Sequence, residues 1–192
     1  HLEQKIAAAC LLVGNKVLSN KFSEAAEKRK AAIQKYCWNE TEGFYFDFDR
    51  STGKQKNVFS LAAAYPLFFK VATKTQAEKL AQVIEQRFLH EGGLISTLQT
   101  TGQQWDAPNG WAPLHWIAVA GLENYDFTSL AETIAKRWIQ LCTNVFSRTG
   151  KLMEKYNVVN TQLEAGGGEY PGQDGFGWTN GVLLALIKKY GS

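Results

Sequence analysis

Apolar residues recur every three or four positions along most of this chain, which is the spacing of one face of an α-helix. The first such face consists of Leu2, Ile6, Cys10, Val13 and Val17. The whole pattern predicts about seven helices, over residues 2–18, 23–37, 60–72, 76–88, 111–124, 129–146 and 179–190. The first six fall into three pairs, and the last has no partner. We therefore expect an all-α fold that is a piece of a larger ring of helical hairpins.

Local signals predict how the helices begin and bend. A Ser or Thr followed three residues later by Glu is a capping box, and the segments 75–78 and 129–132 fit this pattern. Thr179 is a candidate cap for the last helix, and Pro66 predicts a kink in the helix over 60–72. Between helices, the alternating aromatic residues of segment 43–49 predict a short strand.

Length and charge indicate one globular region spanning residues 1–192. The net charge is +3, and the basic residues are scattered along the helices, which is not the pattern of a nucleic-acid-binding surface. No apolar run approaches the roughly 18 residues of a membrane-spanning helix. The three histidines, His1, His90 and His115, lack the spacing of metal ligands. We therefore expect no nucleic-acid or membrane partner, no metal and no cofactor.

The long connections between helix pairs carry the residues best suited to bind a ligand. In the segment 102–116, Trp105 and Trp111 offer flat indole faces, while Asp106 and Asn109 offer short hydrogen-bonding groups. A sugar needs both, because its C–H faces pack on aromatic rings and its hydroxyls need polar partners. These four residues are therefore candidates for binding a carbohydrate.

A second candidate segment, Gly166 to Gly181, combines seven glycines with Glu169, Tyr170 and Trp178. It lacks the preceding strand and the lysine of a phosphate-binding loop. Glycines let a backbone approach a ligand and move, so we expect a lid over a neutral sugar. The nearby Glu154 follows a loop, and its spacing alone would fit an ordinary solvent-exposed carboxylate.

Both segments carry a family resemblance. Residues 104–113 resemble the trehalase signature Gln-Trp-Asp-x-Pro-x-Gly-Trp-x-Pro, and residues 166–182 resemble the glycine-rich segment of the same enzymes. Family members often have one more glycine, where this chain has Ala165. The resemblance implies an (α/α)6 barrel that hydrolyses α,α-trehalose with inversion and without a metal. It also implies that Glu154 is the general base and that Glu169 contacts the sugar from the lid.

The resemblance covers only part of that enzyme. The family's general acid, an Asp in a Trp-Asp-rich motif, and the arginines that hold the second glucose lie upstream of the matching region, and neither motif occurs here. We therefore expect residues 1–192 to be the C-terminal half of a trehalase catalytic domain. Its partner would be the N-terminal half of the same enzyme, and the isolated chain would be inactive.

Other interpretations stay open at this point. The chain could be a carbohydrate-binding helical module without catalysis, or part of a related (α/α)6 glucosidase that acts on another disaccharide. A helical scaffold for protein interaction would leave the glycine-rich lid unexplained. The resemblance fits a periplasmic or a cytoplasmic enzyme equally well.

Overall fold

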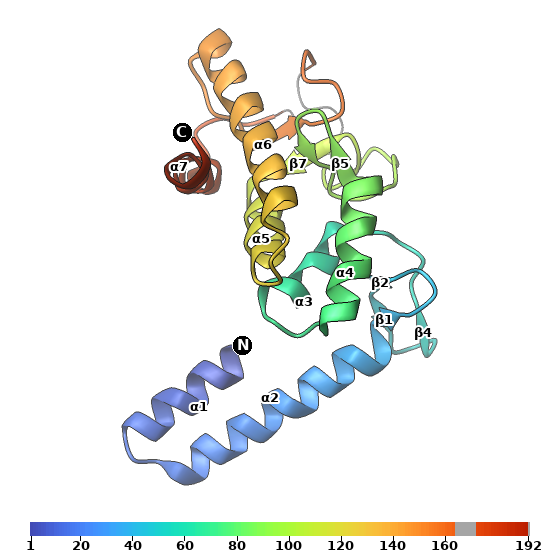
Figure 1. Cartoon of the computed structure of the whole chain (residues 1–192), viewed down its shortest axis with the longest axis vertical. Helices are drawn as coiled ribbons and strands as arrows, with labels where there is room; N and C mark the ends of the chain where they lie inside the picture. The colour runs from blue at the N-terminus through green and yellow to red at the C-terminus, as the bar shows by residue number, and fades with distance from the viewer. Residues whose placement is uncertain (164–171, 192) are drawn as a thin grey trace.

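The computed structural model describes residues 1–163 and 172–191 of the chain, and this part is mostly helical (Figure 1). Its α-helices are α1 (Leu2–Leu12), α2 (Lys16–Tyr36), α3 (Tyr65–Phe68), α4 (Lys74–Val83), α5 (Ala112–Glu123), α6 (Thr128–Thr149) and α7 (Gly177–Tyr190). Short strands occupy the connections, namely β1 (Trp38–Asn39), β2 (Phe44–Tyr45), β3 (Phe48–Asp49), β4 (Lys54–Gln55), β5 (Leu89–His90), β6 (Gly93–Leu94), β7 (Asn109–Trp111) and β8 (Lys155–Asn157). The prediction of about seven helices is thus confirmed for the described part.

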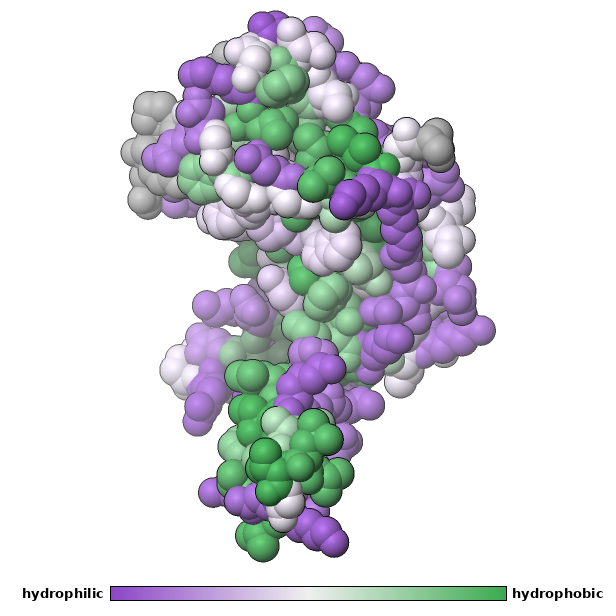
Figure 2. Space-filling model, turned by 90° about the vertical axis from the view of Figure 1, so that its left-hand side faces the viewer, coloured by the Kyte–Doolittle hydropathy of each residue, from purple (hydrophilic) through white to green (hydrophobic). Residues whose placement is uncertain are grey.

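The first two helices form a hairpin that extends from the rest of the molecule (Figure 1). The predicted helix over 2–18 is wrong in its end, because Gly14 adopts a positive φ of 79° and breaks it. The Asn15 side chain then caps α2 by accepting a hydrogen bond from the Leu18 amide, at 3.0 Å. Val13 and Val17 are 81% and 84% exposed, so the apolar face continues past the break without being buried. In Figure 2, hydrophobic residues gather at the free end of this hairpin, at the lower end of the molecule.

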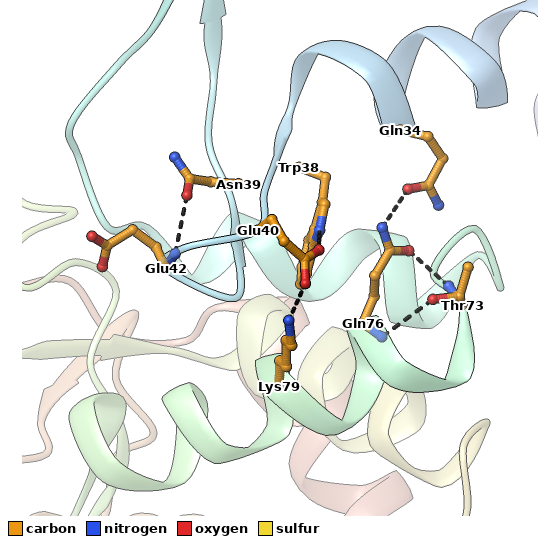
Figure 3. A network of polar contacts seen from close by, with 8 residues as sticks. All are labelled: Gln34, Trp38, Asn39, Glu40, Glu42, Thr73, Gln76 and Lys79. Atoms are coloured by element: carbon orange, nitrogen blue, oxygen red, sulfur yellow. Dashed lines mark hydrogen bonds and ion pairs between the residues drawn. The ribbon is translucent and has the colours of Figure 1, made fainter.

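A network of polar side chains joins α2 to α4 and to the β1–β2 hairpin (Figure 3). Gln76 donates to Gln34 at 2.7 Å and accepts from the Tyr45 hydroxyl at 3.0 Å. Gln76 also forms the reciprocal capping box with Thr73. The predicted cap at Thr75 is therefore wrong by two residues, because Thr73 has the extended backbone from which a cap reaches the helix.

Four other predictions about the helices need correction. The predicted helix over 60–72 is a 3-10 turn, Leu61–Ala64, followed by α3. Pro66 lies in the first turn of α3 and does not kink a longer helix, which fits its missing amide hydrogen. Ser129 is inside α6, whose first turn has no side-chain cap. Thr179 is inside α7, and its hydroxyl donates to the Met153 carbonyl at 2.7 Å instead of capping the helix.

The core lies where α5, α6 and α7 pack on one another and on the α3 and α4 region. Leu67, Phe88, Val119, Ile134 and Leu186 are fully or almost fully buried in it. Strands β5 and β7 lie at the end of the molecule that α6 also reaches (Figure 1). The predicted strand in segment 43–49 is confirmed, because β2 and β3 both lie within it. The core thus supports the connections that contain β5 and β7 at one end of the molecule (Figure 1).

Candidate active site

Strands β7 and β8 bring segment 102–116 close to Glu154, which the sequence connected with it only by resemblance. They pair antiparallel, with Trp111 opposite Lys155. The Val158 amide extends the pairing by donating to the Pro108 carbonyl at 3.0 Å. Glu154 immediately precedes β8, so the pairing fixes it beside the Trp-rich segment.

Glu154 is held from a second side by the chain that leads into α7. Its amide donates to the Gln173 carbonyl at 2.8 Å, and the Gly175 amide donates to the Leu152 carbonyl at 2.9 Å. Glu154 is only 2% exposed, so it is not the solvent-exposed carboxylate that its spacing alone would suggest. Its backbone is therefore fixed on both sides.

The residue before Glu154 is fixed as well. The Met153 amide donates to the Tyr156 hydroxyl at 2.8 Å, and the Met153 carbonyl accepts from the Thr179 hydroxyl at 2.7 Å. Tyr156 in turn packs edge-to-face on Trp138 of α6, with ring centroids 5.2 Å apart. These contacts anchor the start of β8 to α6 and to α7.

A row of aromatic rings lies in the same region. Trp105 stacks on Trp111 with ring centroids 3.9 Å apart and planes within 7°. Trp178 packs edge-to-face on Trp111 at 5.7 Å, and Phe176 follows at 5.1 Å from Trp178. Trp111 is buried, whereas Trp105 and Trp178 are 44% and 38% exposed. The buried indole thus supports two rings that still offer surface to a ligand.

Gln104 joins this row to β8. Its carbonyl accepts from the Trp111 indole at 3.1 Å and from the Asn109 side-chain amide at 3.2 Å. Its side-chain oxygen faces the Lys155 ammonium at 3.4 Å. Asn109 is fully buried. Because its side-chain amide donates to the Gln104 carbonyl, one of its donors stabilises the loop. Its predicted role in binding a sugar hydroxyl stays a prediction.

Asp106 holds the preceding loop together. One carboxylate oxygen accepts from the Thr97 hydroxyl at 3.1 Å, and the other accepts from the Thr101 amide at 2.8 Å and from the Thr101 hydroxyl. Burial alone would raise the pKa of Asp106, but the hydrogen bonds from Thr101 and Thr97 outweigh it and hold that pKa below its usual range. The contacts of Asp106 are those of a residue that shapes a loop.

The other predicted residues of the lid, Glu169 and Tyr170, lie outside the described residues. Two further residues of this region are buried: Lys155, which no sequence pattern singled out, and His115, which was considered only as a metal ligand. His115 lies on α5 and bonds through its ring to two strand backbones. The sequence signal for this close approach of ring and backbone is the pair of glycines opposite the ring, Gly93 and Gly110. Glycines allow a side chain to approach the backbone, but they do not identify which side chain does so.

A cavity of about 240 Å³ opens between α6 and β8. Met153 and Lys155, the two neighbours of Glu154, contribute to its lining together with Asp174. This volume is below the range of roughly 300–1,000 Å³ that is usual for ligand pockets.

Within residues 1–163 and 172–191, no three His, Cys, Asp or Glu side chains are grouped to hold a metal ion. In the same ranges, no helix is long and apolar enough to cross a membrane.

Comparison with known proteins gives a consistent result. The family model named Trehalase matches residues 1–191. A periplasmic trehalase of Escherichia coli O1:K1 is 42% identical over 186 residues, which are 97% of this chain and 33% of that protein. The chain thus spans about a third of the length of the curated relatives it matches.

Solved structures resemble the fold. The neutral trehalase of Saccharomyces cerevisiae superimposes with a TM-score of 0.76 at 29% identity, over 88% of this chain and 30% of that one. A GH63 mannosylglycerate hydrolase from Thermus thermophilus, in complex with glucose, gives a TM-score of 0.71 at 22% identity, over 97% of this chain and 42% of that one. The second likeness is one of fold alone.

Proposed function

Since this chain belongs to the trehalase family, we propose that it is the C-terminal part of a glycoside hydrolase that splits α,α-trehalose into two glucose molecules. The observation that carries the proposal is the pairing of β7 with β8. It places Trp111, near the end of segment 104–113, opposite Lys155, the residue that follows Glu154.

We propose inversion of configuration as the mechanism. An inverting glycosidase uses two carboxyl groups, roughly 6.5–9.5 Å apart, on opposite sides of the sugar. The base takes a proton from a water molecule, whose oxygen bonds to the anomeric carbon. The bond from that carbon to the bridging oxygen breaks, and the acid protonates this oxygen as the second glucose leaves. One water is consumed, and two glucose molecules are formed.

Glu154 is the proposed general base. In the part of the chain that the structure describes, Asp106 and Glu154 are the buried carboxylates. Asp106 uses both oxygens to hold its own loop, as described above. A base must be held within hydrogen-bond reach of one water, and the fixed backbone on both sides of Glu154 suits that role.

The substrate would bind beside the aromatic row. The exposed faces of Trp105 and Trp178 suit the C–H surface of a pyranose, and Trp111 supports both. We propose that Glu169 and Tyr170 close over the sugar from the glycine-rich segment. The remaining walls of the site, with the general acid, would come from the N-terminal half of the same protein.

Glucose release tests this function. We expect the complete protein to hydrolyse trehalose, with one α- and one β-glucose seen by proton NMR before they interconvert. The 192-residue chain alone should show no turnover, because it lacks the acid and the walls that exclude water. Turnover by this chain alone would place the acid inside it and contradict the division of roles.

The same experiment separates the alternatives. A carbohydrate-binding module predicts that the 192-residue chain binds trehalose tightly without hydrolysing it, which calorimetry would detect. A related glucosidase predicts that the complete protein prefers another α-linked disaccharide, such as maltose, to trehalose.

A further inference from the structure

A fully buried histidine connects the backbones of two strands behind the aromatic row. Nε2 of His115 lies 2.8 Å from the Leu94 amide of β6, and Nδ1 lies 2.9 Å from the Trp111 carbonyl at the end of β7. An amide can only donate and a carbonyl can only accept. His115 is therefore neutral, accepts at Nε2 and donates from Nδ1.

The surrounding backbone leaves room for this ring and for little else. A Cβ atom added to Gly93 would lie 2.3 Å from Nε2 of His115, and one added to Gly110 would lie 3.0 Å from its Cε1. On another side the ring stacks on Trp138, with centroids 3.9 Å apart. The imidazole is thus enclosed by two strand backbones and an indole ring. A small displacement of the ring would have to move these backbones.

The strand end that His115 holds supports both parts of the candidate site. Trp111 carries the stacked ring of Trp105 on one side. In the β7–β8 pair it lies opposite Lys155, the residue after Glu154. Displacing the Trp111 backbone would therefore shift the proposed sugar-binding ring and the proposed base together.

We propose that His115 is a positioning residue, whose two ring hydrogen bonds set the place of Trp111 and, through it, of Trp105 and Glu154. The proposal rests on the function proposed above only for its effect on turnover. A misplacement of about 1 Å can cost a reaction roughly 100-fold. The predicted decrease in kcat/KM is therefore larger than a modest loss of stability would cause in a protein that is still folded.

Replacing the imidazole tests the two hydrogen bonds. In the complete protein, His115→Gln keeps one donor and one acceptor, whereas His115→Phe keeps a flat ring and loses both. Val119→Ala is the matched control, because Val119 is equally buried one turn further along α5. Each variant is assayed well below its melting temperature, so that all are fully folded.

We expect His115→Phe to lower kcat/KM by about 10- to 100-fold, with Val119→Ala and His115→Gln within about threefold of the wild type. Equal kcat/KM for His115→Phe and the wild type would overturn the proposal. So would a loss for Val119→Ala or His115→Gln as large as that for His115→Phe.

A measurement independent of turnover uses the complete protein labelled with 15N-histidine and 15N-tryptophan. We expect long-range 1H–15N NMR spectra to show the proton of His115 on Nδ1, and His115→Phe to speed hydrogen exchange of the Trp111 indole. A proton on Nε2, or unchanged exchange, would overturn the proposal. If the complete protein releases no glucose but these signals behave as expected, the proposed function fails and the positioning role stands.

Discussion

Acid should destabilise the protein through His115. Burial is the main cause that lowers the pKa of His115, opposed by its hydrogen bond to Trp111, and the pKa falls from an ordinary value of 6.5 to about 4. Between these values the unfolded chain binds a proton and the folded chain does not. His115 therefore favours the folded state fully above pH 6.5, and this contribution is lost as the pH falls toward 4.

The pKa values set the size of the effect. The two pKa values differ by about 2.5, and at about 1.4 kcal/mol per pKa unit this amounts to about 3.5 kcal/mol. A domain is stable by roughly 5–15 kcal/mol, so a loss of this size is easily measured. It should appear as a falling free energy of unfolding between about pH 6.5 and pH 4.

Urea denaturation of the wild type and of His115→Gln isolates this contribution, because glutamine does not titrate. Asp106 and His90 also have shifted pKa values, but both proteins contain them and their effects cancel in the difference. The wild type should lose about 2–3 kcal/mol more than His115→Gln between about pH 7.5 and pH 4.5. Parallel profiles, within about 0.5 kcal/mol, would refute the assignment of a neutral, buried His115.

Three further changes follow from the site and its supports. Trp105→Ala should raise KM for trehalose in the complete protein by about tenfold and leave the melting temperature nearly unchanged, because the ring is half exposed; an unchanged KM would remove Trp105 from the site. Asp106→Ala should lower the free energy of unfolding by about 1–3 kcal/mol, because the groups that donate to its two oxygens lose their hydrogen bonds. A loss of activity at unchanged stability would instead indicate direct contact with the sugar. Gly93→Ala should cost about 2–4 kcal/mol in urea denaturation because its Cβ would overlap His115, whereas Gly53→Ala, also at positive φ but in open space, should cost only about 1 kcal/mol; equal costs would contradict the tight packing around His115.

Helical periodicity predicted which segments are helical better than where they end. The stripe through Ile134 and Trp138 is buried as expected in α6. The stripe from Leu2 to Val17 continues through a break, because periodicity does not register the positive φ of Gly14. The sequence predicted Thr75 as the cap where the structure has Thr73. Two threonines lie close to the start of the same helix, and backbone geometry decides which of them caps it.

The candidate site was predictable only in part. Residue type singled out Trp105, Trp111 and Trp178, and motif resemblance singled out Glu154 as the base. Neither signal gives the contacts of these residues. The partners of Asp106, Thr97 and Thr101, lie in the same loop, but nothing in the linear order shows that the loop folds back on its carboxylate. The contacts of His115 could not be predicted, because its partners lie on two strands that meet only in the folded chain.

The central claim is that Glu154 activates water for the hydrolysis of trehalose. The most direct measurement compares kcat and KM of the complete protein with those of its Glu154→Gln and Glu169→Gln variants. Glu154→Gln should lose roughly 10²–10⁴ in kcat, the usual contribution of a general base, with KM largely kept. Glu169→Gln should retain clearly more turnover than Glu154→Gln. Near-normal turnover in Glu154→Gln, with turnover abolished in Glu169→Gln, would put the base in the glycine-rich segment and contradict the account.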